Sequence, residues 1–177
     1  VLPKPVQDPH PPLWVTVTSP GTELDAADRG IGCLGVAAAS FAEQERRTKE
    51  YHRRIQQCDP VGAVNDQVAT LNFLYCHEDL GTAGERGMAM LGTFFLLNSH
   101  LLFTREAYPT RAYPSLANLA PGKGRSSSGS ASAAIGIPEG MCIGDPTAIV
   151  RAVKEWESIG VDQINFLLNT AEALPQE

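Results

Sequence analysis

The sequence predicts an α/β fold in which helices pack against a mostly parallel sheet. Short apolar, β-branched segments alternate with longer segments of helical periodicity, and N-cap residues precede three of the four helical segments. Strands that alternate with helices join as a parallel sheet through right-handed crossovers. Because 43% of the 177 residues are hydrophobic, we expect residues 1–177 to form one domain with a substantial core.

The first strand is expected over residues 13–18, where a short apolar segment follows a cluster of prolines. Ser19 is a suitable N-cap and Pro20 a suitable first residue for a helix over residues 20–29. A glycine ends that helix, and residues 31–36 have the composition of a second strand.

The next helix begins with a capping box, in which Ser40 is followed three residues later by Glu43. It is expected to continue to Cys58, with one charged face and with three residues turned inward: Phe41, Tyr51 and Ile55. Residues 68–76 then have the β-branched and aromatic content of a third strand.

The apolar segment 88–103 predicts a buried helix rather than a membrane span. Polar residues interrupt it, and it is shorter than the roughly 20 residues that a spanning helix needs. Periodicity is then lost over residues 104–140, and residues 123–135 are almost entirely Gly, Ser and Ala around one Arg. We expect a flexible insertion there, either a lid over bound ligands or an inert segment.

The last helix is expected to begin with Asp145 as N-cap and Pro146 as its first residue. Its apolar residues are Ile149, Val150, Val153 and Trp156. A glycine closes the helix, and residues 164–168 predict a fourth strand.

Charge and cysteine spacing exclude several classes of partner. The formal net charge of -6 argues against a nucleic-acid-binding protein, because such proteins gather Lys and Arg into a basic face. The four cysteines are far apart, without a CxxC pair or a histidine at metal-ligand spacing, so we expect reduced structural thiols and no metal site. The N-terminal residues lack a basic segment followed by an apolar one, which predicts a cytoplasmic protein.

The turn over residues 16–22 is the candidate site. In parallel α/β folds, ligands bind beyond the carboxyl ends of strands, and the N-terminus of the following helix attracts anions. The hydroxyls of Thr18, Ser19 and Thr22 are placed to face one phosphate, with Gly21 allowing its oxygens to approach the backbone. The alternative is that Ser19 only caps the helix while Glu23 and Asp25 complement the helix dipole.

The sequence has four histidines, for which functional and structural roles differ in their support. His10 is expected to cap or pack a rigid turn. His77 comes with Glu78 and Asp79 at the carboxyl end of a predicted strand, where barrel active sites lie, but the two acids are equally suited to begin the next helix. The remaining two are expected to be structural: His52 and His100.

Two segments resemble the bacterial luciferase-like family of flavin-dependent oxidoreductases. Residues 7–35 read QDPHPPLWVTVTSPGTELDAADRGIGCLG and are similar to the family's QxPHPPxxV strand, Ser/Thr turn and AA-x-x-G helix. Residues 143–166 read IGDPTAIVRAVKEWESIGVDQINF and match the late GDP turn and helix more loosely.

The resemblance implies a TIM (β/α)8 barrel that holds FMN or a deazaflavin, commonly as a homodimer or heterodimer. It implies a flavin-dependent monooxygenase or related oxidoreductase acting on a small organic substrate, with the flavin phosphate at Thr18, Ser19 and Thr22. The alternatives are a deazaflavin-dependent hydride transferase and a non-catalytic flavin-binding subunit. No catalytic residue is assigned, because the family's first four strands have no counterpart here.

Four strands do not close an eight-stranded barrel, and they leave two strand edges uncovered. We therefore expect the chain to supply the last four strands, the C-terminal half of one barrel domain. Either the first half precedes Val1 in a longer protein, or a half-length protein pairs with another chain.

Overall fold

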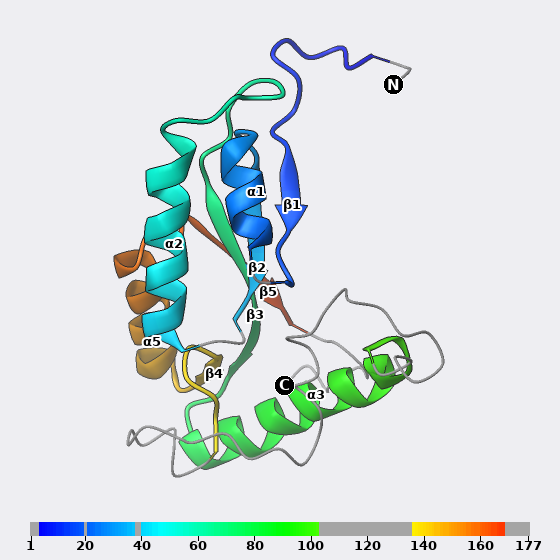
Figure 1. Cartoon of the computed structure of the whole chain (residues 1–177). Coiled ribbons are helices and arrows are strands. Elements are labelled where there is room, and N and C mark those ends of the chain that lie inside the picture. The colour runs from blue at the N-terminus through cyan, green and yellow to red at the C-terminus, as the bar shows by residue number, and fades with distance from the viewer. Residues whose placement is uncertain (1–3, 20, 38–39, 103–135, 169–177) are drawn as a thin grey trace.

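The computed structural model describes residues 4–19, 21–37, 40–102 and 136–168 (Figure 1). Most of the segment predicted to be a flexible insertion, residues 104–140, therefore lies outside the described residues. Its last five residues, 136–140, are described, and Ile137 among them is buried in a hydrophobic cluster.

Strands and helices alternate, as predicted. Their order is β1 (Trp14–Thr16), α1 (Thr22–Asp28), β2 (Gly32–Val36), α2 (Phe41–Ile55), β3 (Val68–Cys76), α3 (Leu80–Leu102), β4 (Cys142–Gly144), α5 (Pro146–Ser158) and β5 (Gln163–Leu167). The strands form one parallel sheet in the order β1-β2-β3-β4, with β5 also paired to β3. The α/β fold with a parallel sheet is confirmed.

The structure adds one strand to the four that the sequence predicted. This strand is β4, which has three residues and pairs with the carboxyl end of β3, where Cys142 is opposite Leu74. So short a strand carries no alternating pattern that sequence analysis can detect. It exists because the end of β3 offers it backbone hydrogen-bonding groups.

The predicted beginnings of two helices are wrong. Helix α3 begins at Leu80 rather than at Met88, because the Asp79 carboxylate accepts hydrogen bonds from Thr82 N (2.8 Å) and Thr82 Oγ1 (2.7 Å) and so caps it. Helix α1 begins at Thr22, and Ser19 is not its N-cap. That position belongs to Gly21, whose φ of 92° lies in the left-handed region.

The other two helix caps are confirmed. Ser40 Oγ accepts a hydrogen bond from Glu43 N at 3.4 Å, although α2 ends at Ile55 rather than at Cys58. Asp145 Oδ1 accepts one from Ala148 N at 2.7 Å. The three residues of α2 predicted to turn inward are all buried: Phe41, Tyr51 and Ile55.

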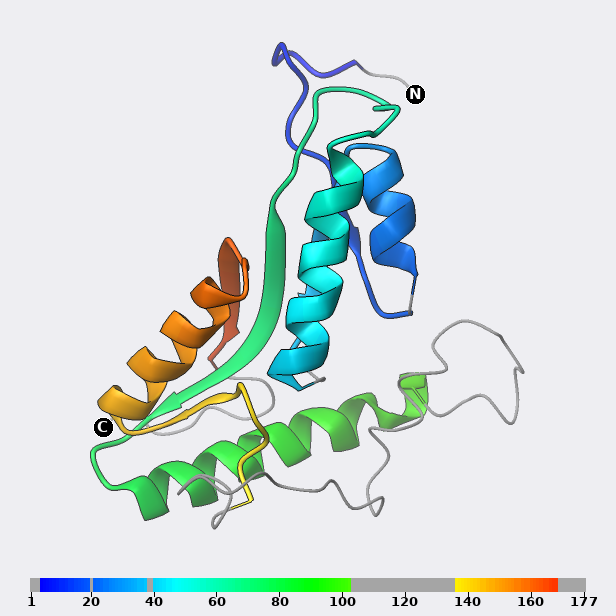
Figure 2. The same cartoon turned by 60° about the vertical axis from the view of Figure 1, so that its left-hand side comes forward.

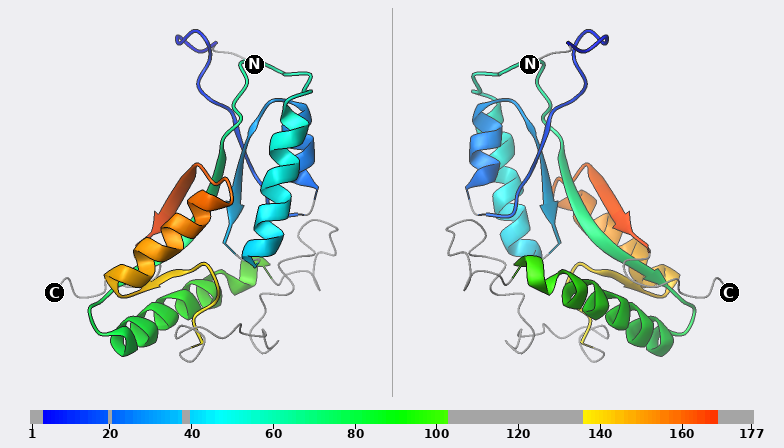
Figure 3. Two further views of the ribbon diagram at one scale, coloured as in Figure 1. Left: turned by 90° about the vertical axis from the view of Figure 1, so that its left-hand side faces the viewer. Right: turned by 90° about the vertical axis from the view of Figure 1, so that its right-hand side faces the viewer.

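The two faces of the sheet are covered differently. Successive residues of β3 point to opposite faces. Val68 packs with Phe41 and Trp156, on the face that α1, α2 and α5 cover, whereas Phe73 packs with Met90 and other residues of α3 on the other face. Figure 2 shows α3 crossing the carboxyl ends of the strands. The right-hand view of Figure 3 looks onto the strands with α1, α2 and α5 behind them.

Both outer edges of the sheet expose large apolar side chains. Strands β1 and β5 each pair with one neighbour only among the described residues. Exposed apolar residues lie in and next to these two strands: Leu13, Trp14, Phe166 and Leu168. The expectation of uncovered strand edges is thus met by the described part of the chain.

Two further expectations concern the inward face of α5 and the absence of a membrane-spanning helix. Trp156 is buried, as predicted, whereas Val150 is 53% exposed, so the prediction that it turns inward is wrong. None of the described helices has the length and apolar character needed to cross a bilayer.

Tyr51 fastens α2 to the loops at the amino ends of the strands. Its side chain is buried, and its hydroxyl lies 2.9 Å from Ile31 O and 3.2 Å from Asn65 O. Burial, with a smaller contribution from Cys33, raises the pKa of Tyr51, so the hydroxyl remains a donor.

We expect Tyr51→Phe to lower the free energy of unfolding by about 1–2 kcal/mol, because it leaves buried carbonyl groups without this donor. Urea unfolding of the full-length protein measures the change. Tyr75→Phe is the matched control, because within the described residues the contact of the Tyr75 hydroxyl is a long one, 3.5 Å to Arg86. Equal effects of the two substitutions would contradict the role assigned to Tyr51.

Candidate functional site

The turn between β1 and α1 brings together the three hydroxyl residues predicted from the sequence. Thr18, Ser19 and Thr22 are half-buried and follow the carboxyl end of β1 within a single turn. Thr22 N donates to Ser19 O at 3.3 Å, which closes the turn. A Cβ added to Gly21 would meet no atom within 4 Å, so the turn is open to a ligand at that point.

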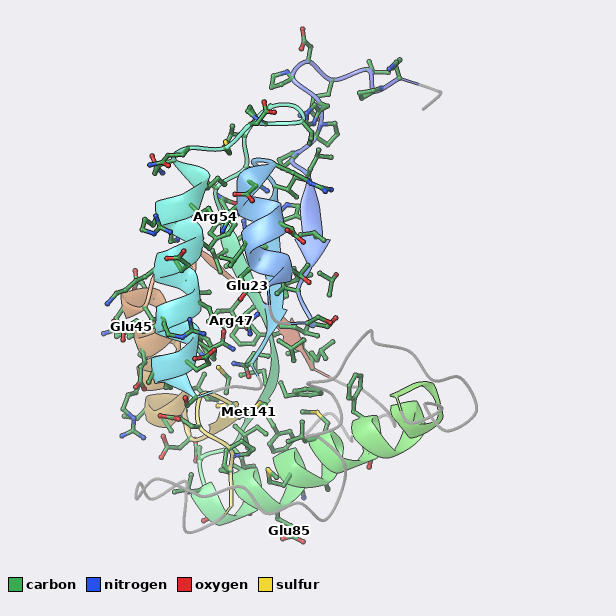
Figure 4. The ribbon with its side chains drawn as sticks, viewed as in Figure 1. Glu23, Glu45, Arg47, Arg54, Glu85 and Met141 are labelled. Carbon is green, nitrogen blue, oxygen red and sulfur yellow. The ribbon has the colours of Figure 1, made fainter. Side chains whose placement is uncertain are left out.

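Glu23 already serves as an anion beside this turn. Its Oε2 accepts the Gly21 N–H at 3.0 Å, and its Oε1 accepts Arg47 Nε from α2 at 2.8 Å. The Glu23 side chain is 12% exposed, and in Figure 4 it lies between α1 and α2 with Arg47 next to it. The Gly21 N–H, a backbone donor within the turn, is therefore occupied.

The charge of Glu23 is held in place by its partners. Burial acts to raise the pKa of Glu23, but the hydrogen bond and charge of Arg47, together with backbone donors that include Gly21, bring this pKa below its ordinary value. Glu23 therefore stays ionised at neutral pH and is compensated by Arg47. The other acidic residue of this helix turn, Asp25, is exposed to solvent.

These contacts decide how a phosphate group fits the turn. Three hydroxyls in one turn are suitable donors to phosphate oxygens, and the open side of Gly21 leaves room for them. The Gly21 N–H is engaged by a carboxylate, so a phosphate would meet this turn through its hydroxyl-bearing side chains. The residues present thus fit a phosphate through Thr18, Ser19 and Thr22.

Two of the histidines have structural roles, as predicted. His10 Nδ1 donates to Pro11 O at 2.8 Å, and its Nε2 accepts Ala63 N–H at 3.0 Å, so its ring fastens the N-terminal segment to the loop before β3. His52 Nε2 donates to Gly160 O at 3.2 Å, which ties α2 to the end of α5. The side chain of His100 lies outside the described part of the chain.

His77 lies at the carboxyl end of the sheet, where α3 begins. Its Nδ1 accepts the Asp79 N–H at 3.0 Å, so the ring proton of the neutral form is on Nε2. Asp79 caps α3, which confirms the structural interpretation of that acid. A functional role for His77 stays a prediction.

Two of the four cysteines are buried in the core. All four are free thiols, and Cys33 and Cys142 are buried. Burial, with a smaller contribution from Glu23, raises the pKa of the Cys33 thiol to about 12, and burial raises that of Cys142 to about 11, so neither forms a thiolate at neutral pH. The described residues hold no group of three or more side chains suited to a metal ion.

The fold of this chain is similar to that of several solved structures. No family model and no curated protein matches the sequence. Among solved structures, the monooxygenase RslO1 from Streptomyces bottropensis matches over 98% of this chain and 45% of its own, with a TM-score of 0.59 and 16% identity. The oxygenating constituent of 3,6-diketocamphane monooxygenase from Pseudomonas putida, a type II Baeyer–Villiger monooxygenase in complex with FMN, matches over 90% and 43%, with a TM-score of 0.55 and 15% identity.

A third structure is the coenzyme F420-dependent tetrahydromethanopterin reductase from Methanopyrus kandleri, which matches over 86% of this chain and 44% of its own, with a TM-score of 0.51 and 18% identity. This chain has the luciferase-like fold. It spans less than half the length of each of these luciferase-like structures, so it represents part of a TIM barrel. At these identities the likeness concerns the fold alone.

Within this luciferase-like fold, sequence analysis missed the partners of the candidate turn. The sequence places Arg47 in a charged helical segment and Glu23 near the start of another helix, with nothing to link them. The two are 24 positions apart and meet because α1 and α2 pack side by side. No pattern of neighbouring residues in the sequence indicates that such a pair will form.

Proposed function

We propose that this chain is the second half of a flavin-dependent luciferase-like oxidoreductase, a monooxygenase that acts on a small organic substrate. The observation that carries the proposal is the open, hydroxyl-bearing turn 18–22 at the carboxyl end of β1. Its fold is shared with monooxygenases, one of them in complex with FMN. The resemblance of residues 7–35 to the family supports this choice, and it further supports a dimer.

In this proposal the turn binds the phosphate of FMN. The hydroxyls of Thr18, Ser19 and Thr22 donate hydrogen bonds to its oxygens, while the Glu23–Arg47 pair anchors the turn to α2. The flavin supplies the redox chemistry when it is bound. The chain contributes binding, orientation and exclusion of water at the carboxyl ends of its strands.

A deazaflavin-dependent hydride transferase is the second candidate. The observation in its favour is the shared fold with the coenzyme F420-dependent reductase. Titrating the full-length protein with FMN and with a deazaflavin, followed by cofactor fluorescence, distinguishes the two. Tight binding of FMN supports the monooxygenase, tight binding of the deazaflavin supports hydride transfer, and binding of neither contradicts both.

The double substitution Ser19→Ala/Thr22→Ala tests the phosphate assignment. Hydrogen bonds to charged groups contribute about 1.5–3 kcal/mol each, so we expect FMN binding at least tenfold weaker. Binding of riboflavin, which lacks the phosphate, should change little. Isothermal titration with both ligands measures the two affinities.

The control is Ser158→Ala, which removes an exposed hydroxyl at the end of α5, away from the turn. It should leave both affinities unchanged. Unchanged FMN affinity in the double variant, or an equal loss for FMN and riboflavin, would refute phosphate binding by these two hydroxyls.

A further inference from the structure

The contacts of Glu23 are those that a bound phosphate would seek. Its carboxylate takes a backbone N–H from the turn and an arginine from the neighbouring helix. Backbone N–H groups and arginine side chains are the donors that proteins use for phosphate oxygens. We propose that Glu23 is an internal anion of the phosphate turn, which competes with phosphate for Gly21 N–H and Arg47 and so determines how tightly the turn binds it. This inference rests on the proposed function.

The position of Arg47 supports this competition. It lies in the second turn of α2, whose N-terminus follows the carboxyl end of β2, so it reaches the same end of the sheet as turn 18–22 (Figure 4). Its side chain is 23% exposed. Only Nε is bonded to Glu23, and within the described part of the chain its two Nη groups have no hydrogen-bond partner. The guanidinium thus has donors left for a second anion.

The charges near the turn determine whether Glu23 weakens or strengthens phosphate binding. Glu23 and Arg47 cancel one another, Asp25 on the same helix is negative, and the whole chain carries a net charge of -6. A phosphate monoester carries nearly two negative charges at neutral pH. Neutralising Glu23 would leave Arg47 without its hydrogen-bonded carboxylate and with only the weaker charge interaction with Glu43, which favours phosphate.

A second ion pair provides a matched control. Asp28 and Arg54 also join α1 to α2, with Arg54 Nη2 2.7 Å from Asp28 Oδ2. This pair lies at the opposite ends of the same two helices, away from turn 18–22, as the label of Arg54 in Figure 4 shows. Asp28→Asn therefore removes a carboxylate from the same helix pair without changing the charge next to the turn.

The test measures the affinity for inorganic phosphate in the full-length protein. Glu23→Gln, Glu23→Gln/Arg47→Gln and Asp28→Asn are compared with the wild type. Each is heated with increasing phosphate at constant ionic strength, with chloride as the compensating salt, and the rise in Tm gives an apparent Kd. Circular dichroism confirms that each variant is folded.

We expect Glu23→Gln to bind phosphate about tenfold more tightly than the wild type, as the loss of a charged competitor implies. Asp28→Asn should match the wild type, and the double variant should lose the gain because it lacks Arg47. No gain in Glu23→Gln, an equal gain in Asp28→Asn, or a gain that persists in the double variant would each overturn the proposal.

A measurement on the wild type avoids the risk that breaking a half-buried ion pair unfolds the variant. Phosphate is expected to shift the Nε–H resonance of Arg47 and to leave that of Arg54 in place. Absence of a shift at Arg47 would overturn the proposal. The proposed flavin site fails separately, if the wild type binds FMN and riboflavin equally while Glu23→Gln still gains affinity for inorganic phosphate.

Discussion

Replacing Trp156 by alanine is expected to lower the free energy of unfolding by about 3–5 kcal/mol, the usual cost of removing a buried aromatic side chain. Trp156 is 1% exposed and packs against Phe41, with ring centroids 4.8 Å apart. Its Nε1 also donates to Gly140 O at 2.9 Å. The substitution therefore opens a cavity between α2 and α5 and removes a buried hydrogen bond.

Thermal unfolding of the full-length protein measures this effect. A domain of this size loses about 2–4 °C in Tm per kcal/mol, so the expected decrease is on the order of 10 °C. Val150→Ala on the same helix is the control, because its side chain is 53% exposed and should change Tm little. Similar decreases for both substitutions would contradict the assignment of Trp156 to the core.

Replacing Asn72 by leucine is expected to cost about 2–4 kcal/mol, although leucine has the same branching of its heavy atoms. Asn72 is fully buried in β3, its Nδ2 donates to Gly140 O at 2.7 Å, and its Oδ1 accepts Cys142 N–H at 3.1 Å. Leucine leaves the Cys142 N–H without its acceptor in a buried position. We expect β4 to detach from β3, which hydrogen exchange at Cys142 and Ile143 would show.

Asn165→Leu is the matched control for this substitution. Asn165 lies opposite Leu71 in the neighbouring strand β5 and is exposed, so its replacement should change stability by less than about 0.5 kcal/mol. Because Asn72 and Trp156 share Gly140 O as acceptor, their effects should not add when both are replaced. Strict additivity would show that the two side chains act independently.

The caps and periodicities that predicted the elements are local. Residues 68–76 are a strand in the structure, as predicted, and Ser40 and Asp145 cap their helices. Such features lie within a few residues of one another, so the sequence displays them directly. For the same reason the three hydroxyls of turn 18–22 were found together in advance.

Errors arose where a local signal was ambiguous. Ser19 and Gly21 are both acceptable N-cap residues, and Gly21 takes the position in the structure. Val150 belongs to an apolar set on one helix, but the packing of α5 leaves it exposed. In both cases the choice depends on neighbouring elements that a short window of sequence does not contain.

The sequence by itself determined the alternation of strands and helices, the parallel sheet, the uncovered edges and the hydroxyl-bearing turn. Only the tertiary structure decided that Glu23 meets Arg47, that Asn72 and Trp156 converge on Gly140, and that α3 packs on the face opposite to the other helices. The physical reason is separation along the chain. Periodicity and capping are fixed by neighbours a few residues apart, whereas these contacts join residues 16 to 68 positions apart that come together only when helices and strands pack.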